Sequence, residues 1–323
     1  MTLPSRDQLT ILFGHPAYRV KAAFDALGSG VRTLEVDTFP AFEAQVGAAD
    51  VVVCSGFWRN QFLARDHRLK FIQSISAGTD QYDRAALAAA KVRLASAHGV
   101  NVNAVSDHAM ALVLAIARRL PEARDNQVKR LWRPMQSDHA LREDELAGKT
   151  ILVVGLGRIG GRVAKLAKAF DMTVIGVRRN RLDEPGHADE VHSFRDLPAL
   201  LPRADYVVLN CPLTDETRGL IDAAALARFK PSAWLVNTAR GGCVDEPALI
   251  AALEAGTLAG AALDTVAEEP LPASSPLWGM PNVIVTPHTA GETRRYEANV
   301  ARILQANLDR LWAGDDTLIN GIV

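Results

Sequence analysis

The sequence predicts an α/β protein made of two lobes, each built on a parallel sheet in doubly wound form. Short apolar runs alternate with helical patterns through residues 1–100, and a second alternation starts at Ile151. Strands that alternate with helices are typical of parallel sheets. With 323 residues, 48% of them apolar, the chain is long enough for two domains with sizeable cores. Two separate series therefore indicate two lobes rather than one sheet.

The first series predicts five strands and two helices. We expect one helix over Ala17–Leu27, where Gly28 ends it, and another over Tyr82–Ala90. The strand candidates are Thr10–Phe13, Arg32–Val36, Val51–Cys54, Phe71–Ile75 and Val92–Ala95.

A long amphipathic helix is expected between the two series. Apolar residues recur at helical spacing across Asn103–Leu120, and Pro121 is predicted to stop this helix. The polar segment Arg124–Gly148, which contains Trp132, is predicted to be rich in loops.

The second series predicts six strands, and a final helix follows them. This helix is expected over Glu292–Ala313 and is closed by Gly314. The strand candidates are Ile151–Val154, Thr173–Val177, Tyr206–Asn210, Trp234–Asn237, Gly260–Leu263 and Val283–Thr286.

A glycine-rich turn directly follows the strand Ile151–Val154. It reads Gly155-Leu156-Gly157-Arg158-Ile159-Gly160 and opens a helical pattern. In a dinucleotide-binding turn, the first glycine allows the tight bend, the second admits a pyrophosphate, and the third lets helix and strand pack closely. The phosphates lie at the helix N-terminus, where backbone N–H groups favour anions. The sequence therefore predicts a nicotinamide-type cofactor.

Composition argues against several other classes of protein. The formal net charge of −1 gives no bulk attraction to nucleic acid or to anionic membranes, and no stretch approaches the ~20 apolar residues of a membrane span. Cys54, Cys211 and Cys243 are too few and too scattered for a disulfide framework or a metal site. The N-terminus lacks an apolar core of signal-peptide length. We expect a cytoplasmic protein without a metal.

Three polar groups of residues lie at strand ends in the second series. Arg240, followed by two glycines, could offer a planar cation to a carboxylate or carbonyl, with a surface arginine as the alternative. Glu268 and Glu269 follow the strand that ends near Asp264, with a solvated acidic loop as the alternative. A carboxylate 19 residues upstream could orient His288 for acid–base catalysis, with a structural histidine as the alternative. Together these groups suit proton-coupled hydride transfer to a carbonyl.

The motifs around these residues closely resemble those of the D-isomer-specific 2-hydroxyacid dehydrogenases. They read, in order, G-L-G-R-I-G, N-T-A-R-G-G, A-L-D-T-V-A-E-E-P-L-P and V-T-P-H-T-A-G, and the likeness extends upstream to Ser76–Asp80 and His98–Asn103. This family includes glyoxylate/hydroxypyruvate reductases and phosphoglycerate dehydrogenases. The resemblance implies a Rossmann dinucleotide-binding domain, residues 103–288, inserted into a flavodoxin-like substrate domain of residues 1–102 and 289–323. It also implies a homodimer formed through the cofactor domain.

The resemblance further implies a role for each candidate residue. Arg240, Glu269 and His288 would be catalytic, and Glu269 is favoured over Glu268 because it stands immediately before the proline. The residues expected to bind the cofactor are Gly155, Gly157, Arg158, Ile159, Gly160, Arg178, Arg179, Cys211, Pro212, Thr217, Thr238, Ala239, Arg240, Asp264, His288 and Gly291. The residues expected to bind the substrate are Ala77, Gly78, Arg240, His288 and, from its place in the sequence, Trp58.

The resemblance also implies which ligand group is bound at two of these places. One position departs from the family pattern. By resemblance, Asp264 would contact the nicotinamide carboxamide, and backbone N–H groups of Ser76-Ala77-Gly78 would bind the substrate carboxylate. Ser106-Asp107-His108 stands where the family more often has Ala-Glu-His. The shorter aspartate keeps the charge but reduces the reach of that side chain.

The residues after the strand Thr173–Val177 indicate which nicotinamide is preferred. NAD enzymes carry an acidic residue about 20 positions after the glycine turn, which binds the ribose 2′-hydroxyl. Here the strand is followed by Arg178-Arg179-Asn180-Arg181, with no acid before Asp183. Arginines pair with a 2′-phosphate, so we expect NADP to be preferred and NAD to be possible. A solvent-facing basic turn is the alternative.

The substrate is expected to be a small 2-oxo acid. Trp58 could wall the substrate pocket and Arg59 could meet a second anionic group, with packing or surface roles as alternatives. The chain stops at Val323 without the regulatory extension of many phosphoglycerate dehydrogenases. With the arginine cluster, this favours a reductase of glyoxylate or hydroxypyruvate, while a longer 2-oxo acid stays open.

Two other kinds of function stay open as alternatives. The superfamily includes transcriptional corepressors that sense the dinucleotide, although no added partner-binding segment is visible in the sequence. Dehydrogenases of formate or phosphite use the same scaffold. Formate enzymes usually have a longer N-terminus, and phosphite enzymes carry a lysine near the position of Ala77.

Overall fold

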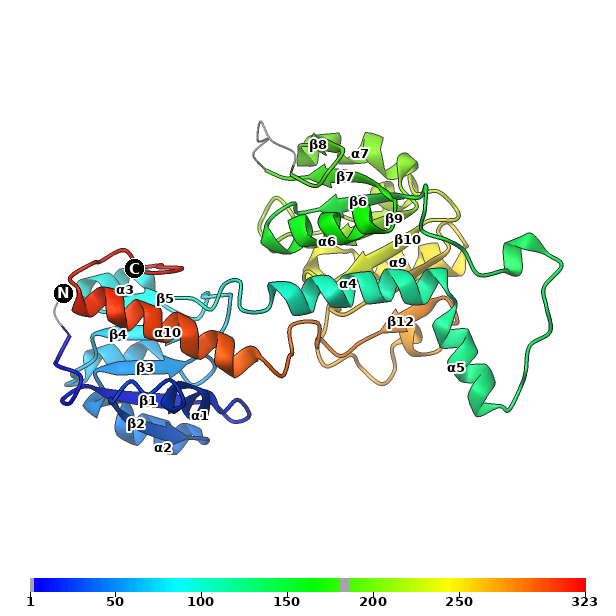
Figure 1. Cartoon of the computed structure of the whole chain (residues 1–323). Helices are drawn as coiled ribbons and strands as arrows, with labels where there is room; N and C mark the ends of the chain where they lie inside the picture. The colour runs from blue at the N-terminus through cyan, green and yellow to red at the C-terminus, as the bar shows by residue number, and fades with distance from the viewer. Residues whose placement is uncertain (1–2, 180–185) are drawn as a thin grey trace. The chain divides into compact units, whose positions relative to one another are not determined.

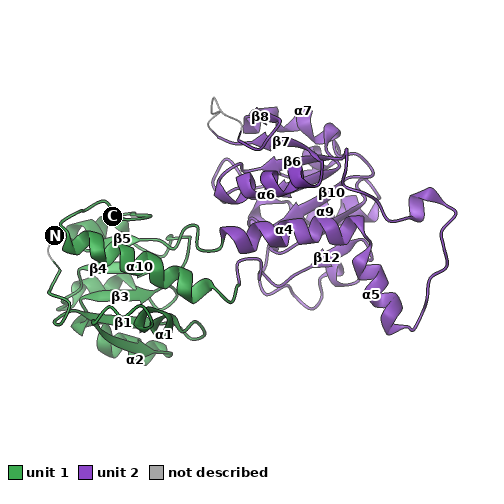
Figure 2. Ribbon diagram, in the orientation of Figure 1, with its two compact units in different colours: residues 1–101, 293–323 green, residues 102–292 purple. Residues whose placement is uncertain are grey.

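The computed structural model describes residues 3–179 and 186–323, which form two compact units (Figures 1 and 2). Unit 1 comprises residues 1–101 and 293–323, and unit 2 comprises residues 102–292. Unit 2 is thus an insertion in the chain of unit 1. The expected domain limits were 102/103 and 288/289. They differ by one residue from the boundary 101/102 and by four from the boundary 292/293.

Unit 1 contains a five-stranded parallel sheet in the order β2-β1-β3-β4-β5. This strand order is that of a doubly wound flavodoxin-like fold. The strands are β1 (Thr10–Gly14), β2 (Arg32–Val36), β3 (Val51–Cys54), β4 (Phe71–Ser74) and β5 (Arg93–Ala95). The helices are α1 (Val20–Asp25), α2 (Phe39–Gln45), α3 (Arg84–Ala89) and α10 (Tyr296–Trp312).

Helices cover both faces of the unit 1 sheet. Successive strand residues point to opposite faces, so each face has its own apolar cluster. Val52 of β3 belongs to an apolar cluster with Phe42 of α2 and Leu87 of α3. Its neighbour Val51 belongs to the opposite cluster, which includes Leu304 of α10. The last helix of the chain therefore completes the core of the first lobe.

Unit 2 contains a seven-stranded parallel sheet in the order β12-β11-β10-β9-β6-β7-β8. This is the Rossmann order with an added edge strand, and it reverses between β6 and β9. The strands are β6 (Thr150–Val154), β7 (Thr173–Val177), β8 (Glu190–His192), β9 (Tyr206–Leu209), β10 (Trp234–Asn237), β11 (Gly260–Leu263) and β12 (Val283–Val285). The helices are α4 (Val102–Ala117), α5 (Leu120–Val128), α6 (Arg158–Ala169), α7 (Leu197–Leu200), α8 (Ala223–Leu226) and α9 (Glu246–Glu254).

The unit 2 sheet also has a core on each face. Val153 of β6 packs in one cluster with Val113 of α4 and Val163 of α6. The next residue, Val154, lies in the opposite cluster with Leu249 of α9. The predicted fold class, two doubly wound parallel sheets with a Rossmann unit inserted in a flavodoxin-like one, is confirmed.

The prediction at Pro121 is wrong in its detail. The first helix, α4, already ends at Ala117, and Arg119 has a left-handed φ of +49°. Pro121 then lies in the first turn of α5. Proline is accepted there because the first N–H groups of a helix have no intrahelical partner. Proline thus starts a helix whose second half runs into Arg124–Gly148, the segment predicted to be rich in loops.

Shorter elements complete the described part of the chain. The edge strand β8 has no counterpart among the strands predicted from the sequence, because three residues give too short a pattern. No helix among the described residues combines the length and apolar character needed to cross a membrane. Short 3-10 helices span Val46–Ala48, Asn60–Ala64, His139–Leu141, Phe194–Asp196, Leu201–Arg203, Gly241–Cys243 and Pro276–Trp278.

Candidate active site

The glycine-rich turn joins β6 to α6 where the strand order of unit 2 reverses. Gly155 has a φ of +99°, and a Cβ on it would lie 2.5 Å from the backbone nitrogen of Cys211. A Cβ on Gly160 would lie 2.2 Å from the carbonyl oxygen of Gly155. Close packing of the turn therefore requires glycine at both positions.

Gly157 stands in open space instead. A Cβ on this residue would meet nothing within 4 Å, although the residue is the N-cap of α6. Arg158 and Ile159 form the first turn of that helix. A helix N-terminus with room in front of it suits an anion such as a pyrophosphate. The residues present fit a dinucleotide here.

Two arginines follow β7, the strand beside β6. The backbone N–H of Arg178 donates to the carbonyl oxygen of His192 at 3.1 Å. The exposed Arg179 places Nε 3.2 Å from Oε2 of Glu216. An exposed ion pair of this kind contributes little and can be exchanged for another anion. The other predicted residues of this stretch, Asn180, Arg181 and Asp183, lie outside the described residues.

The segment after β9 is held by its own hydrogen bonds. The Thr217 hydroxyl donates to the carbonyl oxygen of Pro212 at 2.6 Å. Cys211 is buried with its thiol beside that of Cys243, and this hydrogen bond together with burial raises the pKa of Cys211. The Cys211 side chain therefore stays a neutral packing group.

Arg240 lies in a turn after β10 that the side chain of Asn237 holds. The Asn237 amide donates to the carbonyl oxygen of Arg240 at 3.1 Å, and its Oδ1 accepts from the N–H of Ala239 at 3.0 Å. The Thr238 hydroxyl donates to Oδ1 of Asn210 at 3.0 Å, which ties the turn to the segment after β9. The exposed guanidinium of Arg240 donates to the carbonyl oxygen of Ala239 at 2.6 Å.

Gly241 brings this turn against the segment that carries Glu269. A Cβ on Gly241 would lie 1.8 Å from the carbonyl oxygen of Val266, so a larger residue cannot fit without movement of the backbone. Glu246, in the first turn of α9, accepts a hydrogen bond from the N–H of Ala267 at 2.8 Å. Both contacts fix the loop between β11 and Glu269.

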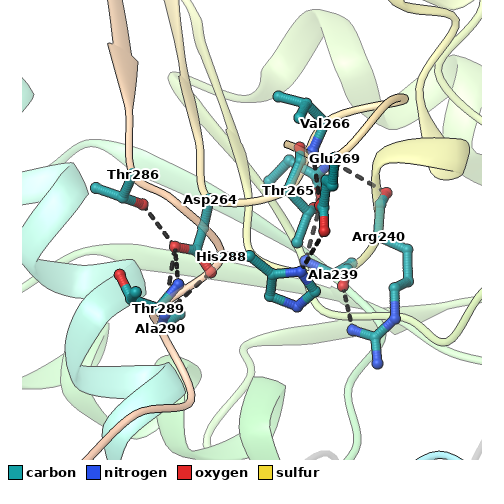
Figure 3. A network of polar contacts seen from close by, with 11 residues as sticks. Ala239, Arg240, Asp264, Thr265, Val266, Glu269, Thr286, His288, Thr289 and Ala290 are labelled. Carbon is teal, nitrogen blue, oxygen red and sulfur yellow. Dashed lines mark hydrogen bonds and ion pairs between the residues drawn. The ribbon is translucent and has the colours of Figure 1, made fainter. Parts of the chain in front are cut away.

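Glu269 and His288 form a hydrogen-bonded pair (Figure 3). Nδ1 of His288 lies 2.7 Å from Oε2 of Glu269, and the other carboxylate oxygen accepts from the N–H of Val266 at 3.2 Å. Because Nδ1 faces the carboxylate, Nε2 is directed away from it. Among the described residues, no hydrogen bond to Nε2 is present. Figure 3 shows Arg240 in the same network, with its guanidinium extending past the imidazole.

Asp264 fixes the turn that bears His288 (Figure 3). Its side chain is buried, and its carboxylate accepts from the Thr286 hydroxyl at 2.6 Å and from the N–H groups of Thr289 and Ala290 at 3.0 and 3.1 Å. His288 itself has a φ of +55°, a left-handed conformation that histidine tolerates. The predicted nicotinamide contact of Asp264 stays a prediction, and Gly291 follows at the end of this turn.

Several supporting contacts in unit 2 were not predicted from the sequence. His108 of α4 places Nε2 3.0 Å from the Thr286 hydroxyl oxygen and 3.6 Å from Oδ1 of Asp264. Asp107, despite its short side chain, lies 2.5 Å from Nη1 of Arg162 on α6. These contacts join residues far apart in the chain, so no local pattern announces them. The only signal in the sequence was Ser106-Asp107-His108, which stands where the family more often has Ala-Glu-His.

The remaining predicted residues belong to unit 1. Ala77 and Gly78 are exposed after β4, and among the described residues neither backbone N–H donates a hydrogen bond. Trp58 is 2% exposed, its ring packs against Phe62 and Tyr82, and its Nε1 donates to Asn60. This burial favours the packing role of Trp58 over the expected wall of a substrate pocket.

The chain matches the model of a known protein family and is similar to a reductase of another organism. The family model described as "D-isomer specific 2-hydroxyacid dehydrogenase, NAD binding domain" matches residues 110–290. A glyoxylate/hydroxypyruvate reductase B of Pectobacterium carotovorum is 35% identical over 285 residues, which cover 87% of this chain and 88% of the relative.

Two solved structures are similar along nearly the whole chain. A D-isomer specific 2-hydroxyacid dehydrogenase family protein of Aeromonas salmonicida has a TM-score of 0.84 and 31% identity, covering 98% of this chain and 99% of the other. A D-isomer specific 2-hydroxyacid dehydrogenase of Xanthobacter autotrophicus, in complex with NADPH and MES, has a TM-score of 0.79 and 28% identity, covering 97% and 98%.

Proposed function

Because this chain belongs to the D-isomer-specific 2-hydroxyacid dehydrogenases, a family of NAD(P)-dependent oxidoreductases, we propose that it reduces a small 2-oxo acid to the D-2-hydroxy acid. The observation that carries this proposal is the Glu269–His288 pair in one network with Arg240. The three residues come after β10, β11 and β12. These strands belong to the same parallel sheet as β6, which the glycine-rich turn follows.

His288 is the proton donor in this proposal. Its Nδ1 is held by Glu269 at 2.7 Å, so the ring presents Nε2 to the substrate. In reduction, Nε2 gives a proton to the carbonyl oxygen as that oxygen gains negative charge, and in oxidation it takes the proton back. Glu269 orients the ring and stabilises the imidazolium form.

Arg240 binds the substrate and polarises its carbonyl group. A guanidinium can hold a carboxylate and a carbonyl oxygen through two parallel donors, which a lysine ammonium cannot reproduce. The backbone N–H groups of Ala77 and Gly78 are proposed to bind the substrate carboxylate, since they donate to nothing else in the described chain.

The cofactor is proposed to be NADP(H) in preference to NAD(H). Gly157 and the N-terminus of α6 would hold the pyrophosphate, Gly155 and Gly160 allow the close packing of the turn, and Arg178 with Arg179 would hold a 2′-phosphate. The bound nicotinamide supplies or accepts the hydride. NADPH in the related Xanthobacter structure supports this choice.

Glyoxylate and hydroxypyruvate are the proposed substrates, in line with the Pectobacterium relative. Steady-state kinetics over a panel of 2-oxo acids, each with NADPH and NADH, tests both choices. We expect the highest kcat/KM for glyoxylate or hydroxypyruvate with NADPH. An NADH preference would reject the cofactor choice. Activity with formate or phosphite and none with 2-oxo acids would reject the function.

The chain is proposed to form a homodimer through unit 2. Figure 2 shows the excursion of the chain from α5 to β6. It carries large exposed apolar side chains, with Trp132 95% and Met135 98% exposed. Exposed apolar groups gathered on one segment are typical of interaction surfaces. A cytoplasmic location is proposed as well, because Cys54, Cys211 and Cys243 are all unpaired thiols.

A further inference from the structure

A small polar cluster lies at the carboxyl edge of the unit 1 sheet. Ser55 directly follows β3 and Ser76 follows β4, and these strands are parallel neighbours with Cys54 paired to Ser74. The two hydroxyl oxygens are 2.5 Å apart. The amide of Gln81 donates to the Ser55 oxygen at 3.2 Å. We call Ser55, Ser76 and Gln81 the hydroxyl cluster.

The hydroxyl cluster adjoins the proposed carboxylate site. Ser76 immediately precedes Ala77 and Gly78, and its own carbonyl oxygen accepts from the N–H of Ala97 at 3.0 Å. The N–H of Ser76 donates to the Ser74 hydroxyl at 3.1 Å. The backbone around Ser76 is thus fixed on both sides, and its side chain belongs to the residue next to the two N–H groups proposed to hold the substrate carboxylate.

The cluster retains capacity for another hydrogen bond. Ser55 and Ser76 are half-buried and Gln81 is exposed. A serine hydroxyl has one donor and two acceptor positions, and a glutamine amide has an acceptor oxygen as well as its donors. In the described chain, Oε1 of Gln81 accepts no hydrogen bond. The cluster therefore matches a ligand hydroxyl, which both donates and accepts.

We propose that the hydroxyl cluster makes the enzyme prefer 2-oxo acids with a hydroxyl on the third carbon over analogues in which the third carbon is an unsubstituted methyl group. This rests on the proposed function, because it takes the substrate carboxylate to lie at Ala77 and Gly78. A methyl group beside the cluster leaves polar atoms without partners, which a hydroxyl would satisfy. Hydroxypyruvate and pyruvate differ in this group alone.

The guanidinium of Arg59, in the loop after β3, does not favour a second anion at this place. Nη1 of Arg59 donates to the carbonyl oxygens of Gly56 and Trp58, both at 2.7 Å. Its guanidinium carbon also lies 4.8 Å from the ring centre of Phe39. A phosphate on the third carbon would have to draw Arg59 away from these three contacts. A neutral hydroxyl requires no such change.

The test measures kcat/KM for hydroxypyruvate, pyruvate and glyoxylate, which has no third carbon. The variants are Ser55→Ala and Gln81→Leu, with Gln61→Leu as the control, since Gln61 is an exposed glutamine of the same unit outside the cluster. We expect the wild type to prefer hydroxypyruvate over pyruvate. Both cluster variants should lower the ratio of hydroxypyruvate to glyoxylate about ten-fold, because a half-exposed site discriminates less than a buried one. Gln61→Leu should leave it unchanged.

Three results would overturn the proposal. One is a wild type that does not prefer hydroxypyruvate over pyruvate. Another is an equal loss on glyoxylate and hydroxypyruvate in both variants, which would mean damage to the loop rather than loss of a specific contact. The third is an unchanged kcat/KM on both substrates in both variants. Inactivity of the wild type on every 2-oxo acid would instead reject the proposed function.

Discussion

Gly241 is the residue at which the Arg240 turn meets the loop that carries Glu269. A Cβ there would lie 1.8 Å from the carbonyl oxygen of Val266. Gly241→Ala should therefore push the two loops apart, cost about 3 kcal/mol of stability and lower kcat. Chemical denaturation and steady-state kinetics measure the two effects.

Gly242 provides the matched control for this substitution. A Cβ on Gly242 would first meet the flexible side chain of Leu213, at 3.1 Å. Gly242→Ala should therefore cost clearly less stability than Gly241→Ala. Equal stability and activity of the two variants would contradict the proposed packing of the loops.

The candidate site could be located in the sequence because its main residues follow strands directly. Arg240 and His288 follow β10 and β12, and the carboxyl ends of parallel strands meet at one edge. The sequence could not show that Asn237 and Asp264 hold these turns through hydrogen bonds to backbone groups. Trp58 was expected to wall a pocket because strand position gives no measure of burial. Its partners Phe62 and Tyr82 come from later elements.

At the scale of elements, strands were predicted more accurately than helix ends. Buried parallel strands are continuous apolar runs, so their limits are sharp in the sequence. Helix ends depend on capping contacts that a pattern does not reveal. The helix expected from Ala17 starts at Val20, because the ring of His15 accepts the backbone N–H groups of Ala17 and Tyr18.

The His15 contact predicts a pH dependence of stability. Nδ1 accepts the two N–H groups at 3.0 and 2.8 Å, which only the neutral ring can do. Burial, and then the charge of Arg19, lower the pKa of His15. A lowered folded-state pKa gives stability that is present above the unfolded value of about 6.5 and is lost as the pH falls through the folded value.

His15→Asn tests this dependence, since asparagine offers an acceptor that does not titrate. The drop in thermal midpoint between about pH 8 and about pH 5 should be smaller in His15→Asn than in the wild type. Thermal unfolding followed by circular dichroism gives both values. An identical drop in the two proteins would show that the His15 contact does not contribute.

At the scale of the whole molecule, the sequence predicted two sheets and the insertion of one lobe in the other. This prediction rested on the break between the two series of strands. The helix α4 lies at this break, and unit 2 begins with it. Assembly is a property of surfaces, and the sequence of residues 120–141 did not show which of its side chains would be exposed. Trp132 and Met135 are both almost fully exposed in the structure.

The proposed dimer predicts that these side chains are buried between two copies. Trp132→Ser combined with Met135→Ser should shift the protein from dimer to monomer, because it removes large apolar groups from the contact. Size-exclusion chromatography with light scattering measures the mass. Leu27→Ser, an exposed apolar residue of unit 1, is the control and should stay dimeric. A wild type that is monomeric at all concentrations would exclude the dimer.

In the proposed reaction, His288, held by Glu269, passes the proton while a bound nicotinamide exchanges the hydride. The most direct measurement compares His288→Ala with the wild type in glyoxylate-dependent oxidation of NADPH across pH, together with NADPH binding by fluorescence. We expect kcat to fall at least about 100-fold with little change in the NADPH Kd, because the ring acts on the substrate and not on cofactor binding. Turnover near the wild-type rate across the pH range would contradict the account.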